Sequence, residues 1–300
     1  MEQRTGLLIL NKEEGMTSQT AVTRVRRLFG AAKAGHSGTL DPMATGVLPV
    51  MLDRATGASE FLLSGDKHYR AVLRLGITTD TEDTTGETET RFEGDLPPAE
   101  AVIAAARGFL GEQEQIPPMY SALKQGGRKL CDLARAGITV EREPRRITVH
   151  SLTVTPLSAT DYALDVVCSK GTYIRTLCAD IGKKLGTGGA MAALCRTEAA
   201  GFPLSAAHTL GELEALSEEE RLALLLPVES LFAAAPSVDL PPFFTRLGRS
   251  GLEIYQKKIG TAFPLGTRVR MRDTGGVFFA LGEVRSFEDG SAIKPIRMFL

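Results

Sequence analysis

The residue whose surroundings most clearly indicate chemistry is Asp41, within the stretch GHSGTLDPMATGVLP at positions 35–49. An aspartate before a proline is biased towards an extended conformation, and flanking glycines allow the backbone to approach a ligand closely. We therefore expect Asp41 on a loop, where its carboxylate is presented rather than buried in a regular element. An isolated Asp-Pro pair more often forms an Asx-type turn, in which the carboxylate caps its own backbone. The surrounding string, rather than the pair alone, favours chemistry.

Two further strings contain side chains that could take part in chemistry. Arg175 lies in GTYIRTLCADIG (171–182), and a guanidinium near a carboxylate favours the ionised form by lowering the pKa. Tyr69 lies in KHYR (67–70), at the start of an alternating apolar and polar run that is typical of a strand. Taken alone, Arg175 would be interpreted as an exposed helix residue and Tyr69 as ordinary strand packing.

The string around Asp41 closely resembles the catalytic motif of the TruB family of tRNA pseudouridine synthases, GHxGxLDPxATGxLP. Further segments resemble family motifs in the same order along the chain. They are KEEGMTS (12–18), KHYR (67–70), PPMYSALK (117–124), GTYIRTLCADIG (171–182) and LCRTEAAGF (194–202). The resemblance extends over almost the whole chain, and it implies isomerisation of uridine 55 in the T-loop of tRNA to pseudouridine.

The resemblance also implies a role for individual side chains. Asp41 is the nucleophile, Arg175 holds it ionised, and Tyr69 stacks on the flipped base and takes up the C5 proton. Substrate binding is expected from His36, Tyr173, Leu194, Lys12, Lys124 and Arg128. Tyr173 and Leu194 resemble residues that line the uracil pocket, and His36 resembles one that packs against the extruded nucleotide. For Leu194, packing in the core is the competing interpretation.

The implied reaction breaks the N1 glycosidic bond, turns the uracil and rejoins it to the sugar through C5. It requires a nucleophile, a base and a tight pocket, so we expect no cofactor and no metal. His68, His150 and His208 show no metal-like spacing to one another. Attack at the sugar C1′, attack at uracil C6 and elimination through the 2′-position all use one aspartate, so the sequence leaves the three routes open.

Three positions depart from the family pattern. Glu13 occupies the place of a turn proline, so the turn at 12–18 is expected to be looser. Ala190 stands where a histidine is common, and Cys195 replaces an arginine. The last two changes predict the loss of one RNA contact.

The elements that must position these residues can be predicted from periodicity and turn signals. LLIL (7–10) predicts a buried strand, and a helix from Gln19 to Phe29 should be capped by Thr17 or Ser18. The glycine-rich stretch 35–46 predicts a loop, 68–76 a strand and 99–110 a helix. The stretch 162–186 predicts a strand, a glycine turn and a helix capped by Thr172.

A basic insertion is predicted at about 117–150, where seven Lys or Arg residues accompany three acidic ones. Basic and acidic stretches alternate along the chain, so a basic face is compatible with the net charge of −1. We expect the insertion, with Lys124 and Arg128, to clamp the phosphates of the T-arm stem-loop of tRNA. The alternative is an exposed hairpin whose charged side chains are solvated and bind no RNA.

Two domains are expected. Residues 1–235 should form the catalytic domain, and residues 240–300 a small PUA-like RNA-binding domain, with a proline-interrupted linker near 226–243. GTRVRMR, VFFALGEVR and AIKPIRMF predict short strands in the second domain. The resemblance implies an α+β fold around a mixed, largely antiparallel sheet, with the active site in a cleft across it.

Two other classes of function are compatible with parts of this sequence and are considered as alternatives. A catalytically idle RNA chaperone would use the same basic insertion, whereas a nucleotide-binding metabolic enzyme would need GxGxxG or GxxxxGK[ST], and neither spacing occurs.

The N-terminal apolar run of four residues is too short for a signal peptide or membrane span, so a cytoplasmic protein is expected. Four cysteines without a CxxC pair indicate buried free thiols. A monomer would suffice, because all the roles lie on one chain.

Overall fold

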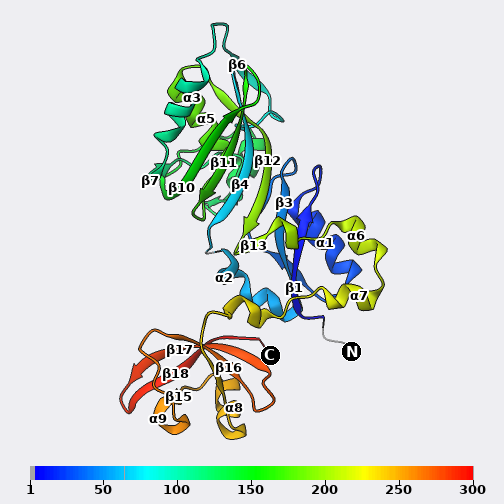
Figure 1. Ribbon diagram of the computed structural model, residues 1–300, viewed down its shortest axis with the longest axis vertical. Coiled ribbons are helices and arrows are strands. Elements are labelled where there is room, and N and C mark those ends of the chain that lie inside the picture. Colours follow the sequence, from blue (N-terminus) through cyan, green and yellow to red (C-terminus); the bar gives the residue numbers. More distant parts are fainter. Residues whose placement is uncertain (1–3, 64, 300) are drawn as a thin grey trace.

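The computed structural model describes residues 4–63 and 65–299, which form two main sheets. Figure 1 shows an elongated molecule with the larger sheet in its upper and middle parts and the C-terminal sheet at its lower end. The larger sheet has nine strands and the smaller one has five. The predicted fold class, a mixed α+β domain with a small β-rich C-terminal domain, is therefore confirmed.

The large sheet brings together strands from the whole first part of the chain. Its main order is β1 (Gly6–Lys12), β3 (Thr45–Leu52), β12 (Gly189–Ala199), β4 (Lys67–Leu75), β11 (Asp161–Cys168), β10 (Arg145–Pro156) and β7 (Gly111–Gln115). β2 (Ala34–His36) pairs with β3, and β13 (Phe202–Pro203) pairs with β12. The predicted strands at 7–10 and 68–76 are confirmed as β1 and β4.

The large sheet consists of two antiparallel halves that meet at β3 and β12. These two strands run parallel and pair only through Cys195 with Thr45 and through Arg196 with Gly46. All other neighbours in this sheet are antiparallel. We call this contact of two residue pairs the junction, because it joins the half containing β1, β2 and β3 to the half containing β4, β10, β11 and β12.

Helices cover the sheet where apolar side chains recur at helical spacing. α1 (Ser18–Leu28) buries Ala21, Val22 and Val25, and it begins where Thr17 accepts a hydrogen bond from the backbone N–H of Thr20. α3 (Ala99–Arg107) and α5 (Ile174–Leu185) pack beside β10 and β12 respectively (Figure 1). The helices expected near 19–29 and 99–110 are thus confirmed.

The remaining elements of the first domain are short. They are η1 (Asp53–Ala58), α2 (Ser59–Leu63), η2 (Leu204–Ala206), α6 (Leu210–Ala215), α7 (Glu218–Ala223) and the hairpin of β5 (Ile77–Thr79) and β6 (Thr88–Arg91). Among the residues described, no helix is both long enough and apolar enough to span a bilayer.

One predicted helix cap is wrong. α5 has Tyr173, not Thr172, as its N-cap residue, and the Thr172 hydroxyl donates instead to the carbonyl oxygen of Ser169, 2.9 Å away. The threonine therefore stabilises the glycine turn that precedes the helix. Position 173 has the extended backbone of an N-cap without a capping side chain.

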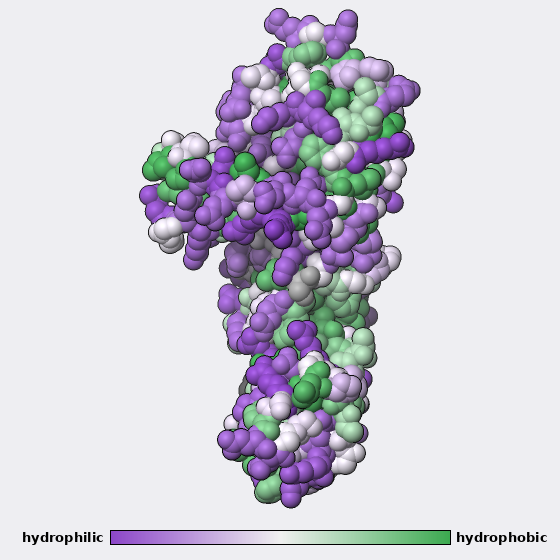
Figure 2. Space-filling model, turned by 90° about the vertical axis from the view of Figure 1, so that its left-hand side faces the viewer, coloured by the Kyte–Doolittle hydropathy of each residue, from purple (hydrophilic) through white to green (hydrophobic). Residues whose placement is uncertain are grey.

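The basic insertion lies outside both main sheets. It contains β8 (Lys124–Gln125), β9 (Arg128–Lys129) and α4 (Leu130–Arg135), and it ends before β10, which begins at Arg145. Because β10 begins at Arg145, we call residues 117–144 the insertion from here on. A lobe projects from the side of the elongated body, and hydrophilic residues cover most of the face in view (Figure 2).

The C-terminal sheet has the order β14 (Ser237–Asp239), β16 (Arg268–Arg272), β17 (Phe278–Phe287), β18 (Gly290–Met298) and β15 (Ile254–Tyr255). α8 (Pro242–Arg249) and α9 (Gln256–Ile259) accompany it. The three strands expected in this region are confirmed as β16, β17 and β18. The core of this sheet includes Met271, Phe279 and Ile293.

A separate apolar cluster connects the two sheets. Phe232 packs edge-on against Phe61 with ring centroids 5.0 Å apart, and it also contacts Phe299 at 6.0 Å. Phe232 belongs to η3 (Val228–Phe232), so the segment expected to be a linker contributes to a core. Arg297 forms an ion pair with Glu60 across the same contact.

Candidate active site

Asp41 lies on the loop between β2 and β3, as expected, although strands occupy both ends of the predicted loop. The backbone on each side of Asp41 is held by hydrogen bonds. The Ser18 hydroxyl donates to the Leu40 carbonyl oxygen at 2.9 Å and accepts from the Leu40 N–H at 2.8 Å. The Ala44 N–H donates to the Asp41 carbonyl oxygen at 3.0 Å. α1 thus fixes the approach of the loop to its carboxylate.

Lys12 lies beneath this loop. It is fully buried, and its ammonium group donates to the carbonyl oxygens of Glu13, Met16 and Pro42 at 2.8, 2.8 and 3.2 Å. These three acceptors occupy all three donors of an ammonium group. In contrast to the predicted substrate contact, Lys12 therefore supports the residue that follows Asp41. The turn at Glu13, expected to be loose, is anchored by the same bonds.

The carboxylate of Asp41 pairs with Arg175, which comes from the first turn of α5. Arg175 Nε lies 2.9 Å from Asp41 Oδ2, and Nη2 lies 3.5 Å from Oδ1. The same guanidinium donates to the carbonyl oxygens of Thr81 and Tyr120 at 2.9 and 2.8 Å. The Arg175 side chain is 5% exposed, whereas that of Asp41 is 36% exposed. A fixed, buried cation therefore holds a carboxylate that remains partly open to a ligand.

Burial raises the pKa of the Asp41 carboxyl above its ordinary value, and the guanidinium of Arg175 opposes that rise. The nearby carboxylate of Asp83 contributes to the rise, and Lys12 opposes it more weakly. The sequence predicted only the lowering effect of Arg175. The net direction is upward because the loop removes much of the carboxyl from water.

Asp83 is a member of the site that the sequence did not indicate. It is buried, and its Oδ2 lies 3.9 Å from Arg175 Nε. Its Oδ1 accepts from the Thr85 N–H at 3.0 Å and from the Thr81 hydroxyl at 2.9 Å. Glu82 beside it has a positive φ of 62°, an uncommon backbone for a non-glycine residue. The sequence showed only an acidic, threonine-rich stretch, which is a weak signal for a buried aspartate.

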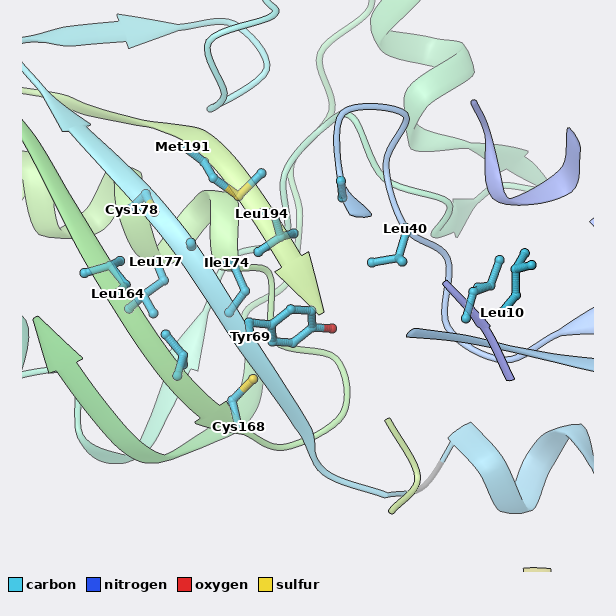
Figure 3. Packing of buried hydrophobic residues seen from close by; sticks show 14 of the residues in the cluster. Leu10, Leu40, Tyr69, Leu164, Cys168, Ile174, Leu177, Cys178, Met191 and Leu194 are labelled. Atoms are coloured by element: carbon cyan, nitrogen blue, oxygen red, sulfur yellow. The ribbon is translucent and has the colours of Figure 1, made fainter. Parts of the chain in front are cut away.

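Tyr69 lies on β4 and is buried in the main core. Figure 3 shows it near Ile174 and Leu194, with its hydroxyl directed towards the side on which Leu40 lies. Leu40 precedes Asp41 in the loop, and Leu40 and Tyr69 belong to the same hydrophobic core. Burial raises the pKa of Tyr69, and the negative charge of the Asp41 carboxylate adds weakly to that rise.

Tyr173 and Leu194 also belong to this region. Gln115 holds the backbone of Tyr173 from both sides, accepting from its N–H at 2.8 Å and donating to its carbonyl oxygen at 3.0 Å. Burial raises the pKa of Tyr173, with a further weak contribution from Asp41. Leu194 is almost fully buried on β12, and its carbonyl oxygen accepts from the Thr45 hydroxyl at 3.4 Å. Gln115 was not singled out from the sequence.

His36 lies at the end of β2, opposite Val50 of β3. Burial lowers its pKa, and the charge of Arg196 lowers it further, so the neutral imidazole is favoured. Its Nδ1 is buried without a hydrogen-bond partner among the described residues. A hydrogen bond to this nitrogen would require the ring to move, because the atom is buried.

Lys124 and Arg128 lie on the exposed hairpin of the insertion, where Lys124 pairs with Lys129 and Arg128 with Gln125. Neither side chain forms a hydrogen bond or ion pair with Asp41 or Arg175, whereas the carbonyl oxygen of Tyr120, at the root of the insertion, accepts a hydrogen bond from Arg175. A cavity of about 280 Å³ lies beside the hairpin, between Lys124, Arg142 and Arg145. The structure therefore places the insertion's cations apart from the carboxylate but connects its root to the site.

The departures from the family pattern have different surroundings. Ala190 is fully buried in β12, so a side chain at this position faces the core. Cys195 is partly exposed, as is Cys131, whereas Cys168 and Cys178 are buried. The expectation of buried free thiols is thus confirmed for two cysteines only. Across residues 4–63 and 65–299, no cluster of His, Cys, Asp or Glu side chains is arranged to hold a metal ion.

Comparisons with known proteins agree with these motifs. A model described as TruB family pseudouridylate synthase (N terminal domain) matches residues 26–174. A second model, described as tRNA pseudouridylate synthase B C-terminal domain, matches residues 175–233. The two matches are contiguous and include Asp41, Tyr69 and Arg175.

Individual relatives match over most of their length. tRNA pseudouridine synthase B of Thiobacillus denitrificans is 44% identical over 281 residues, which cover 94% of this chain and 92% of that protein. The protein of the same name from Dechloromonas aromatica is 49% identical over 237 residues, or 79% of each chain. A chain in the solved structure "Crystal Structure of a Cbf5-Nop10-Gar1 Complex" superposes with a TM-score of 0.73 and 26% identity, covering 98% of this chain and 85% of that one.

Proposed function

Since this chain belongs to the TruB family of pseudouridylate synthases, we propose that it isomerises uridine 55 in the T-loop of tRNA to pseudouridine, with Asp41 as the nucleophile. Family membership makes it an isomerase that acts on tRNA. The uridine and the residue roles are our proposal. The observation that carries the proposal is the Asp41–Arg175 ion pair, in which a buried guanidinium holds a partly open carboxylate.

The geometry suits a nucleophile that must be ionised and correctly oriented. The guanidinium of Arg175 is held in place, because it donates hydrogen bonds to two carbonyl oxygens. The loop cannot easily move either, because Ser18 and Lys12 hold its backbone before and after Asp41. Such preorganisation lowers the cost of reaching the transition state, since fewer groups have to reorient.

The reaction then proceeds on a uridine that has been turned out of the RNA stack, at a cost of a few kcal/mol. The ionised Asp41 forms a covalent adduct with the sugar or the uracil, and the bond between N1 and C1′ breaks. The base turns, the Tyr69 phenol gives its proton to N1, C5 bonds to C1′, and the phenolate so formed takes up the C5 proton. Release of Asp41 restores the carboxylate, so atoms and charge balance without an oxidant or reductant.

Other parts of the molecule are assigned to binding. Tyr173 and Leu194 line the uracil pocket in this proposal, and His36 uses its ring face on the extruded nucleotide, because its Nδ1 is buried. Lys124 and Arg128 bind phosphates of the T-arm from the insertion. Residues 1–235 act as the catalytic domain and residues 240–300 as a PUA-like RNA-binding domain.

The proposal is tested with an unmodified tRNA transcript labelled with tritium at uridine C5. Incubation with the wild-type protein should release tritium, whereas Asp41→Asn should release none, because an amide is neither charged nor nucleophilic. The two proteins should bind tRNA with similar affinity, as measured by filter binding, since Asn preserves the shape of the side chain. Tritium release by Asp41→Asn would refute the role of Asp41. A transcript with cytidine at position 55 serves as the substrate control.

A tRNA-folding activity is a second proposal, favoured by the position of the exposed cations of the insertion on a hairpin outside the catalytic sheet. It predicts that Asp41→Asn still accelerates refolding of a misfolded transcript. We further propose that the protein acts as a monomer in the cytoplasm, because one chain carries all the residues assigned above.

A further inference from the structure

Arg196 is the largest of the fully buried side chains, with 1% of its surface exposed. It lies on β12, two residues after Leu194, at the junction of the two sheet halves. Its Nε donates to the carbonyl oxygen of Val47 and its Nη2 to that of Gly38, both at 2.8 Å. No carboxylate of residues 4–63 or 65–299 forms an ion pair with it. Burying a cation without a counter-ion is costly, and two carbonyl oxygens offset only part of that cost.

The two carbonyl acceptors flank the loop that carries Asp41. Gly38 precedes Asp41 and Val47 follows it, so one guanidinium binds both ends of the segment. The approach is close, because a Cβ atom added to Gly38 would lie 3.1 Å from Arg196 Nη1. A Cβ atom on Gly46 would lie only 2.3 Å from the Arg196 carbonyl oxygen, and Gly46 has a φ of +101°. The Asp41 loop therefore packs directly against Arg196.

The same residue faces Tyr69 on its other side. Arg196 and Tyr69 are opposite each other in the pairing of β12 with β4. Burial raises the pKa of Tyr69, and the charge of Arg196 is the main influence that opposes this rise. Arg196 thus contacts the loop of the proposed nucleophile and lies beside the proposed proton acceptor, which belong to different halves of the sheet.

We propose that Arg196 is a positioning residue of the isomerisation, which fixes the Asp41 loop relative to Tyr69 across the junction without touching the substrate. The inference rests on the proposed function, because it assigns Arg196 no chemistry apart from that of Asp41 and Tyr69. Arg196→Gln removes the charge and the fork of donors. Arg196→Lys keeps the charge but provides a single donor group, which cannot reproduce both bonds in the same geometry.

The experiment compares these variants with wild type by single-turnover tritium release under saturating enzyme, tRNA binding and thermal melting. A displacement of reacting groups by about 1 Å can cost about 100-fold in rate. We expect Arg196→Gln to be slower by about 100-fold and Arg196→Lys by about tenfold on the same basis, with tRNA affinity essentially unchanged. The matched control is Arg221→Gln, since Arg221 also donates to two carbonyl oxygens, those of Leu213 and Leu216, but on α7. The control should lose stability and keep the wild-type rate.

The proposal is overturned if folded Arg196→Gln or folded Arg196→Lys turns over at the wild-type rate. It is also overturned if both variants fail to fold, because Arg196 would then act on stability alone. Should only Arg196→Gln fail to fold, the rate of Arg196→Lys decides. Absence of tritium release from the wild type would instead refute the proposed function, which keeps the two failures distinct.

Discussion

At the scale of single residues, the site combines opposing influences on one carboxyl group. Burial disfavours the charge of Asp41, and Arg175 favours it, so the carboxylate is held reactive and away from bulk water. A solvent-exposed, fully hydrated carboxylate would be a weaker nucleophile. The partial exposure of Asp41 therefore suits attack better than either full burial or full hydration would.

This balance predicts a pH dependence. Because burial raises the pKa of Asp41, its carboxylate takes up a proton at higher pH than an ordinary aspartate does. Only the ionised form attacks, so the single-turnover rate should fall on acidification already above the usual range for aspartate. Arg175→Met removes the charge that opposes the rise and should shift this acid limb upward by about one to three pH units. Lys124→Met, a change on the exposed hairpin, should leave the limb in place. An unshifted limb in Arg175→Met would contradict this account.

The residues that carry local signals could be predicted from the sequence, and those defined by distant contacts could not. Asp41 and Tyr69 lie in short, recognisable strings, and the N-cap Thr17 precedes a clear helical pattern. Asp83 and Arg196 gain their importance only when segments far apart in the chain meet. Arg196, for example, bonds to Gly38, which is 158 positions away. A charged residue in a strand pattern indicates an exposed face, which is the opposite of what Arg196 shows.

At the scale of elements, the insertion separates the cations that we propose to bind phosphate from the residues that we propose to carry the chemistry. The cations of the β8–β9 hairpin are exposed, while the root of the insertion reaches Arg175 through the Tyr120 carbonyl oxygen. Contacts at the hairpin can therefore contribute affinity without altering the carboxylate.

Charge removal in the hairpin tests this separation. Lys124→Gln combined with Arg128→Gln should weaken tRNA binding, because two phosphate contacts are lost. The slope of log affinity against log salt should become less steep by about 1 for each contact. At saturating enzyme the single-turnover rate should equal that of wild type. Arg107→Gln, which removes an exposed cation from α3, is the control and should not change the slope. An unchanged slope in the double variant would place the tRNA elsewhere.

At the scale of the whole molecule, the two sheets share an aromatic contact rather than a flexible connection. Phe232, from the segment predicted to be a linker, packs between Phe61 and Phe299. The proline content of that segment suggested a break, but prolines also occur at the starts of short helices such as η3. The sequence therefore indicated two sheets and missed the core between them.

Truncation of Phe232 tests the energetic weight of this contact. Phe232→Ala should lower the free energy of unfolding by about 3–5 kcal/mol, the usual cost of removing a buried phenyl group. Phe243→Ala removes a ring that is 57% exposed and should have little effect. Chemical denaturation, followed by circular dichroism, measures both. Equal stability of the two variants would show that the contact between the sheets contributes little.

The junction has a consequence for the response to heat. The Asp41 loop joins two strands of one half of the large sheet, whereas Tyr69 lies in the other half and Arg175 lies on α5, which packs against that other half. Only two residue pairs join the halves within the sheet. Segments with few hydrogen bonds between them separate at lower free energy than the bulk of a fold does. Thermal inactivation should therefore precede melting: on gradual warming, tritium release should fail while the circular dichroism of the strands is still intact, and recover on cooling.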